Sequence, residues 1–107
     1  MKLTKDEFKV LVMLYLANVD GEIHSEEIKV MLRKTDCVTV NRIEKLFSEM
    51  SDFEIVDCIR ENKEAYANTE KSRLELIADM IAIMEADEVY TAMEERALRD
   101  LEMVLAQ

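Results

Sequence analysis

The scarcity of helix-breaking residues is the feature that most constrains this chain: its 107 residues include one glycine, Gly21, and no proline. Loops that bind nucleotide phosphates need several glycines, because the backbone must approach the phosphate closely. A β-sandwich with many turns also needs more turn-forming residues than this sequence holds. Half of the residues are apolar, which favours a buried core over disorder. The sequence therefore predicts a single compact, all-α domain over residues 1–107.

Six segments carry apolar residues at helical spacing and are predicted as helices. Thr4 to Glu7 has the pattern of a capping box, so the first helix is expected to start near Lys5. It is expected to stop at Gly21, because glycine adopts the left-handed conformation at helix ends without steric cost. The other five helices are expected to start near Ser25, Thr39, Ser51, Thr69 and Ala92, with Thr39, Ser51 and Thr69 as caps.

Two of the predicted helices, the first and the fifth, are apolar on several sides and are expected to be central in the bundle. In the fifth helix the expected core stripe consists of Leu74, Ile77, Ala78, Ile81 and Met84, with Leu76, Met80 and Ile83 beside it. Six of the eight methionines fall on or beside such stripes: Met13, Met31, Met50, Met80, Met84 and Met103. Methionine is a flexible core residue, so these side chains are expected to fill the core.

The negative charge of the chain is unevenly distributed along the sequence. Residues 1–48 hold eight acidic and eight basic residues, whereas residues 49–107 hold sixteen acidic and six basic residues, for a net charge of −10. Such a surface repels phosphate, which disfavours binding to nucleic acid or to an anionic membrane. It favours cations and basic protein partners.

The sequence shows no signal peptide, and its longest apolar run, Val10 to Ala17, is too short to cross a bilayer. A cytoplasmic protein is expected. Cys37 and Cys58 are the only cysteines, and their spacing forms no zinc or redox motif. Reduced thiols are expected, and an intramolecular disulfide stays open on spacing alone.

An internal repeat relates two segments that each follow an apolar helix and precede an amphipathic one. In the first, Asp20 is followed seven residues later by Glu27; in the second, Asp87 is followed seven residues later by Glu94. The chain is therefore expected to contain two helix–loop–helix units, with two further helices inserted between them.

The pattern Asp-Gly-x-Ile-x-x-x-Glu between two helices, with a partial copy near the C-terminus, resembles the tellurite-resistance TerB-like family. The N-terminal domain of the DnaJ-like co-chaperone DjlA is related to this family. The resemblance extends from Phe8 to Leu105, and the second copy departs from it because Glu88 replaces the glycine. It implies an all-helical domain whose acidic residues bind a metal or a partner in a bacterial stress-response or membrane-associated assembly.

Two interpretations of the repeated acids stay open. In the first they only cap helices: Thr91 to Glu94 has the pattern of a capping box, and Glu27 is placed to act similarly. In the second they bind a hard cation, Ca²⁺, Mg²⁺ or Mn²⁺, through Asp20, Glu27, Asp87 and Glu94. A working EF-hand is excluded, because a leucine or isoleucine would occupy the first ligand position. The lone His24 is expected in a surface or capping role.

A non-enzymatic binding or adaptor module is therefore expected, with an acidic site for which binding of a divalent cation is one of the two open interpretations. Its partner is expected to be a protein that is basic or membrane-associated. The alternative is a metal-independent protein–protein interaction domain, including a homodimer. A small hydrolase is less favoured, because no second catalytic group accompanies the acids. The loop with Asp20 is expected to be better formed than the loop with Asp87, and the latter more acidic.

Overall fold

The structure is a computed structural model, and it describes residues 2–18, 25–85 and 92–106. All regular elements within these residues are α-helices, so the expected all-α fold with six helices is confirmed. The helices are α1 (Lys5–Ala17), α2 (Ser25–Lys34), α3 (Cys37–Glu49), α4 (Asp52–Tyr66), α5 (Glu70–Glu85) and α6 (Ala92–Ala106). Together they form a bundle with principal dimensions of 31 × 27 × 25 Å.

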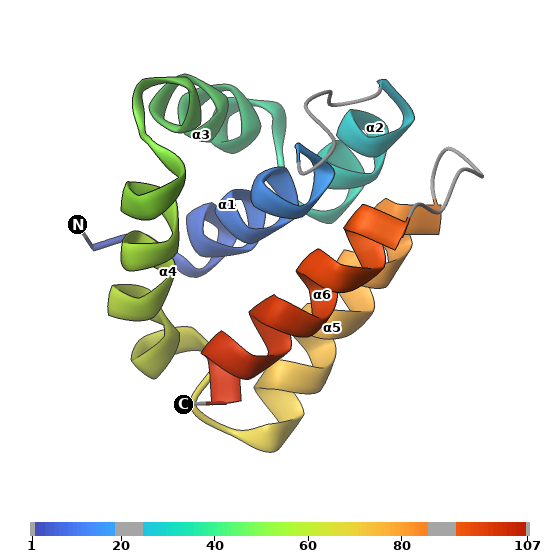
Figure 1. The fold of residues 1–107 in the computed structure, drawn as a ribbon. Helices are drawn as coiled ribbons and strands as arrows, with labels where there is room; N and C mark the ends of the chain where they lie inside the picture. The colour runs from blue at the N-terminus through green and yellow to red at the C-terminus, as the bar shows by residue number, and fades with distance from the viewer. Residues whose placement is uncertain (1, 19–24, 86–91, 107) are drawn as a thin grey trace.

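Helix α1 is the centre of the fold, as its apolar sequence predicts. Nine of its thirteen residues are buried, including every residue from Val10 to Leu14. Figure 1 shows α1 enclosed by α3 and α4 on one side and by the antiparallel pair α5 and α6 on the other. A helix that is apolar on all sides can be stable in water only when its neighbours cover it in this way.

Three of the predicted helix starts, those of α1, α4 and α5, are confirmed by capping hydrogen bonds. Thr4 and Glu7 form the expected capping box at α1, and Ser51 and Glu54 form the one at α4. At α5 the hydroxyl of Thr69 accepts a hydrogen bond from the backbone N–H of Ser72 at 3.1 Å. These side chains satisfy N–H groups that the first turn of a helix leaves without partners.

Two predicted helix boundaries are wrong. The N-cap of α3 is Asp36 rather than Thr39, because the carboxylate accepts from the backbone N–H of Thr39 at 2.8 Å and from its hydroxyl at 2.9 Å. The end of α1 is at Ala17, before Gly21, and the backbone N–H of Asn18 donates to the carbonyl of Leu14 at 3.0 Å. Gly21 itself lies outside the described residues.

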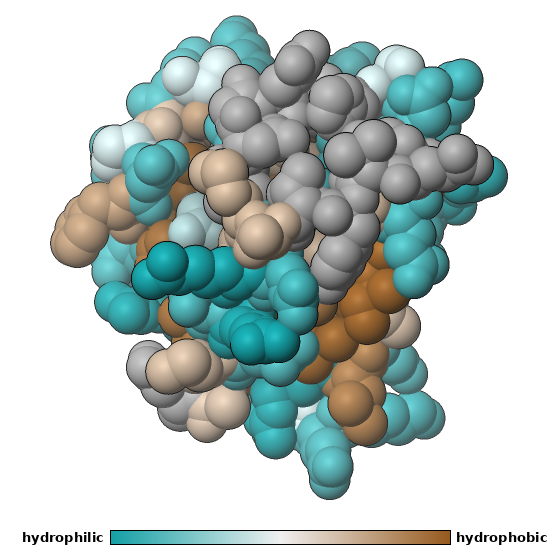
Figure 2. Space-filling view, turned by 45° about the vertical axis from the view of Figure 1, so that its right-hand side comes forward, coloured by the Kyte–Doolittle hydropathy of each residue, from teal (hydrophilic) through white to brown (hydrophobic). Residues whose placement is uncertain are grey.

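The expected core face of α5 is wrong in part: Met84 is buried and Ile77 is partly buried as expected, but the other three residues of the expected stripe are exposed. Leu74 is 59% exposed, Ile81 is 37% exposed and Ala78 is exposed, whereas the buried side chains are Leu76, Met80, Ile83 and Met84. The buried face meets α1, α2 and α6, and no described helix covers the other face. Figure 2 shows hydrophobic side chains at the surface on the side of the molecule that carries α5 and α6. Met103 on α6 is exposed as well.

Side-chain bonds between helices fix the relative placement of these elements. Asp79 on α5 pairs with Lys9 on α1 at 3.3 Å and with Lys34 on α2 at 2.8 Å. Lys63 on α4 donates to the carbonyl of Val104 on α6 at 3.2 Å. These contacts link α5 to α1 and α2, and α4 to α6, and so complement the apolar core.

Candidate functional site

The repeated acids Glu27 and Glu94 occupy equivalent places in the fold. Each is the third residue of its helix, α2 for Glu27 and α6 for Glu94, and their exposed fractions are 1% and 3%. Figure 1 shows that α2 and α6 both begin on the side of the molecule where α5 ends. The repeat detected in the sequence therefore corresponds to a repeated structural position.

Burial of these two carboxylates requires compensation, because a charged group loses its hydration in the protein interior. Each of the two residues has an interaction partner within the structure. The first turn of a helix adds a favourable electrostatic environment, since the helix dipole places partial positive charge there. Both acids are thus suited to accept hydrogen bonds from backbone N–H groups or to face a cation.

The other two members of the predicted metal set, Asp20 and Asp87, lie outside the described residues, as do His24 and Thr91. The expected difference between the two loops concerns the same segments and also lies outside them. Within residues 2–18, 25–85 and 92–106, no group of three or more His, Cys, Asp or Glu side chains is arranged to hold a metal ion. The described part of the chain thus contributes two buried acids to the predicted set.

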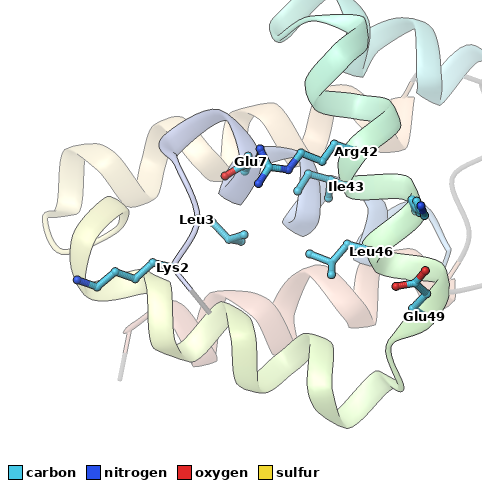
Figure 3. A pocket seen from close by; sticks show the side chains of 8 residues that line it. Lys2, Leu3, Glu7, Arg42, Ile43, Leu46 and Glu49 are labelled. Carbon is cyan, nitrogen blue, oxygen red and sulfur yellow. Dashed lines mark ion pairs between the residues drawn. The ribbon is translucent and has the colours of Figure 1, made fainter.

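A hollow of about 290 Å³ lies between the N-terminus of α1 and helix α3. Leu3, Ile43 and Leu46 form its apolar surface, and Figure 3 shows Leu3 and Leu46 facing the hollow from opposite sides. Glu7 from α1 and Arg42 from α3 form an ion pair of 3.1 Å at its edge.

Sequence reasoning missed this hollow, because the two residues of the ion pair are thirty-five positions apart and Glu7 reads as a capping residue. Glu7 performs both roles: Oε1 accepts from the backbone N–H of Thr4 at 2.9 Å, and Oε2 meets Arg42. The described lining of the hollow contains no serine, cysteine or histidine.

Both cysteines are free thiols, and they differ in exposure. Cys37 is exposed at the start of α3, whereas Cys58 is buried in α4. The disulfide left open by the sequence is therefore not formed in this structure. Burial raises the pKa of the Cys58 thiol above its usual value, and its Sγ lies 3.7 Å from the side-chain nitrogen of Asn62. Cys58 is thus a core residue of low nucleophilicity.

Comparison of the chain with family models, curated proteins and solved structures found no match. The resemblance to the TerB-like family therefore rests on the residues quoted for it. Among the described helices, none combines the length and the apolar composition that crossing a membrane would require.

Proposed function

We propose that this chain is a non-enzymatic binding module whose acidic site, at the starts of α2 and α6, takes a divalent cation. The site would comprise Glu27 and Glu94 with Asp20 and Asp87. The observation that carries the proposal is the equivalent burial of Glu27 and Glu94 in two helix starts that the sequence repeat relates. The TerB-like resemblance adds the biological setting, a bacterial stress-response or membrane-associated assembly with a protein partner.

Charge density supports the cation. Acidic side chains in and beside the two repeat segments number nine: Asp20, Glu22, Glu26, Glu27, Glu85, Asp87, Glu88, Glu94 and Glu95. Carboxylates that are held near one another repel, and a divalent cation relieves that repulsion. Oxygen ligands of this kind suit Ca²⁺, Mg²⁺ or Mn²⁺ better than softer metals.

Thermal unfolding after dialysis against a chelator tests this proposal. A cation at about one hundred times its Kd should stabilise the fold by about 2.7 kcal/mol and raise the Tm accordingly. The shift should disappear in the double variant Asp20→Asn/Asp87→Asn and persist in Asp57→Asn, a matched change on the exposed surface of α4. No shift at millimolar Ca²⁺, Mg²⁺ or Mn²⁺, or the same shift in the double variant, contradicts cation binding at this site.

A second candidate function, a metal-independent protein–protein interaction domain that forms a homodimer, is favoured by a different observation. Leu74, Ala78 and Ile81 form an apolar face on α5 that no described helix covers. A contiguous apolar patch on the surface of a folded protein is a feature of protein–protein interaction sites. Under this alternative, the chelator-treated protein should still associate, and added cations should leave the Tm unchanged.

A further inference from the structure

The exposed residues on the outer face of α5 follow the spacing of a helix-pairing seam. Lys71, Leu74, Ala78, Ile81 and Glu85 are all exposed, and they are separated by three, four, three and four residues. Alternation of three and four is the spacing that keeps one line of side chains facing a second helix. We define these five residues as the α5 seam.

The α5 seam is available for a partner along the length of the helix. The opposite face of α5 packs in the core through Leu76, Met80 and Ile83, so the seam is not needed for packing within the bundle. Neither Lys71 nor Glu85 forms an ion pair within the part of the chain that the structure describes. A helix of sixteen residues extends about 24 Å at 1.5 Å per residue, which allows a second helix to lie beside it.

We propose that the α5 seam is a homodimer interface in which the α5 helices of two copies of this chain lie antiparallel, with the two-fold axis at Ala78. This proposal rests on the protein–protein form of the proposed function. Lys71 and Glu85 are each seven residues from Ala78, on opposite sides of it. Antiparallel pairing around Ala78 therefore places Lys71 beside Glu85 of the second copy, and it does so twice.

The apolar residues agree with the same arrangement. Leu74 lies four residues before Ala78 and Ile81 lies three after it, so Leu74 faces the region of Ile81 of the second copy. The small side chain of Ala78 allows the two helices to approach closely at the axis. Parallel pairing would instead set Lys71 beside Lys71 and Glu85 beside Glu85, which repel.

A second copy is a better occupant than an unrelated helix because a two-fold interface must be self-complementary. Opposite charges at equal distances from a small central residue meet that requirement, whereas a different partner would impose no such symmetry. The dimer is expected to be weak. The seam offers two large apolar side chains per copy, Leu74 and Ile81, and each copy carries a net charge of −10, so the interface belongs to the small, transient class.

Analytical ultracentrifugation of the full chain, from about 10 µM to about 1 mM, measures this equilibrium. Wild type is expected to dimerise within that range, and Leu74→Glu, a change at an exposed position, is expected to abolish the dimer without changing the circular dichroism spectrum. Lys71→Glu and Glu85→Lys are each expected to weaken association by roughly three- to tenfold, because each replaces two attractive contacts by repulsive ones.

A charge-swap variant and a control substitution elsewhere on the surface make the test specific. The double variant Lys71→Glu/Glu85→Lys restores opposite charges at both contacts, so association should return to within about twofold of wild type. Glu85→Lys lowers the net negative charge, so weakening by this variant cannot come from overall repulsion. Lys45→Glu on the exposed surface of α3 changes the net charge as much as Lys71→Glu does, and it should have a much smaller effect.

The outcomes separate this interface from the broader function. A dimer that Leu74→Glu leaves intact overturns the α5 seam while the homodimer function stands. A wild-type monomer at about 1 mM overturns both the seam proposal and the homodimer form. Shifts of α5 amide resonances in that monomer, on adding a basic amphipathic helical peptide, would assign the seam to a different partner and again overturn pairing with a second copy.

Discussion

Replacement of Asn62 by alanine should destabilise the fold by more than any other single polar truncation on α4. The Asn62 side chain is 4% exposed and joins two parts of the chain. Its Oδ1 accepts from the backbone N–H of Leu3 at 2.9 Å, and its Nδ2 donates to the carbonyl of Cys58 at 2.8 Å. The first bond connects positions fifty-nine residues apart and holds the segment before α1 against α4.

The magnitude follows from what the substitution leaves behind. The loss of two hydrogen bonds costs about 1 kcal/mol each, and a buried N–H of Leu3 without its acceptor adds roughly 1–3 kcal/mol. The carbonyl of Cys58 retains its bond within the helix, and alanine is the better helix former by about 0.5 kcal/mol. The net expectation is a decrease of about 2.5–4.5 kcal/mol in the free energy of unfolding, or about 11–20 °C in Tm for a chain of this length.

Urea denaturation followed by circular dichroism measures this effect, with Asn41→Ala on the exposed surface of α3 as the matched control. The control gains the same helix propensity without losing a buried hydrogen bond, so it should be neutral or slightly stabilised. A decrease below about 0.5 kcal/mol for Asn62→Ala, or equal effects in the two variants, would refute the role assigned to Asn62.

Tyr66 provides an independent check on the same contact. Its hydroxyl donates to the carbonyl of Leu3, so Leu3 is held through both of its backbone polar groups. If Asn62→Ala releases this segment, Tyr66→Phe should cost less in the Asn62→Ala background than in wild type. A double-mutant cycle should therefore give a coupling energy above about 0.5 kcal/mol, whereas additive effects would contradict a shared anchor at Leu3.

Two further predictions concern titration. The hydrogen bond from the backbone N–H of Thr39 lowers the pKa of Asp36 in the folded state. The ionised cap therefore stabilises the fold above the carboxyl's unfolded pKa of about 3.9, and this contribution is lost as the pH falls through the lower folded pKa. In urea unfolding, Asp36→Asn should lose less stability than wild type on acidification. Cys37 should react quickly with a thiol reagent and Cys58 slowly, because Cys37 is exposed and Cys58 is buried. Cys37→Ser should therefore remove the fast phase of the thiol reaction. A fast phase that remains in this variant would contradict the burial of Cys58.

The helix count and most helix starts could be predicted because they depend on local chemistry. Each capping box, at Thr4 and at Ser51, consists of residues within a stretch of four. The near absence of glycine and proline leaves few structures other than helices available to the chain. The cap of α3 was misassigned because Asp36 and Thr39 are both good capping residues three positions apart. The structure favours Asp36, whose carboxylate accepts two hydrogen bonds from Thr39 at once.

The buried face of α5 could not be predicted from its own sequence. Apolar residues occur both on the Leu74 and Ile81 side and on the Leu76 and Met80 side, so periodicity identifies a helix but does not choose between its faces. The choice depends on where α1, α2 and α6 lie. The ion pairs of Asp79 with Lys9 and Lys34 agree with the observed rotation of the helix, and they join residues far apart in the sequence.

Comparison of four acids at the third position of a helix shows that capping at this position does not by itself bury the carboxylate. Glu7 and Glu54 both complete capping boxes, but Glu7 is buried whereas Glu54 is exposed. Capping therefore does not require burial. Where burial occurs at Glu7, the positive charge of Arg42 compensates it at 3.1 Å.

Glu27 and Glu94 are more deeply buried than Glu7, so their carboxylates need at least as much positive potential. The helix dipole supplies about half a charge at each helix start, and hydrogen bonds add to it. Both residues also have interaction partners within the structure, and under the proposed function a cation bound between the two repeats would contribute further positive charge. Glu27→Gln and Glu94→Gln should then each reduce the stabilisation by cation, whereas acids that only cap should leave it unchanged while lowering the stability of the cation-free protein.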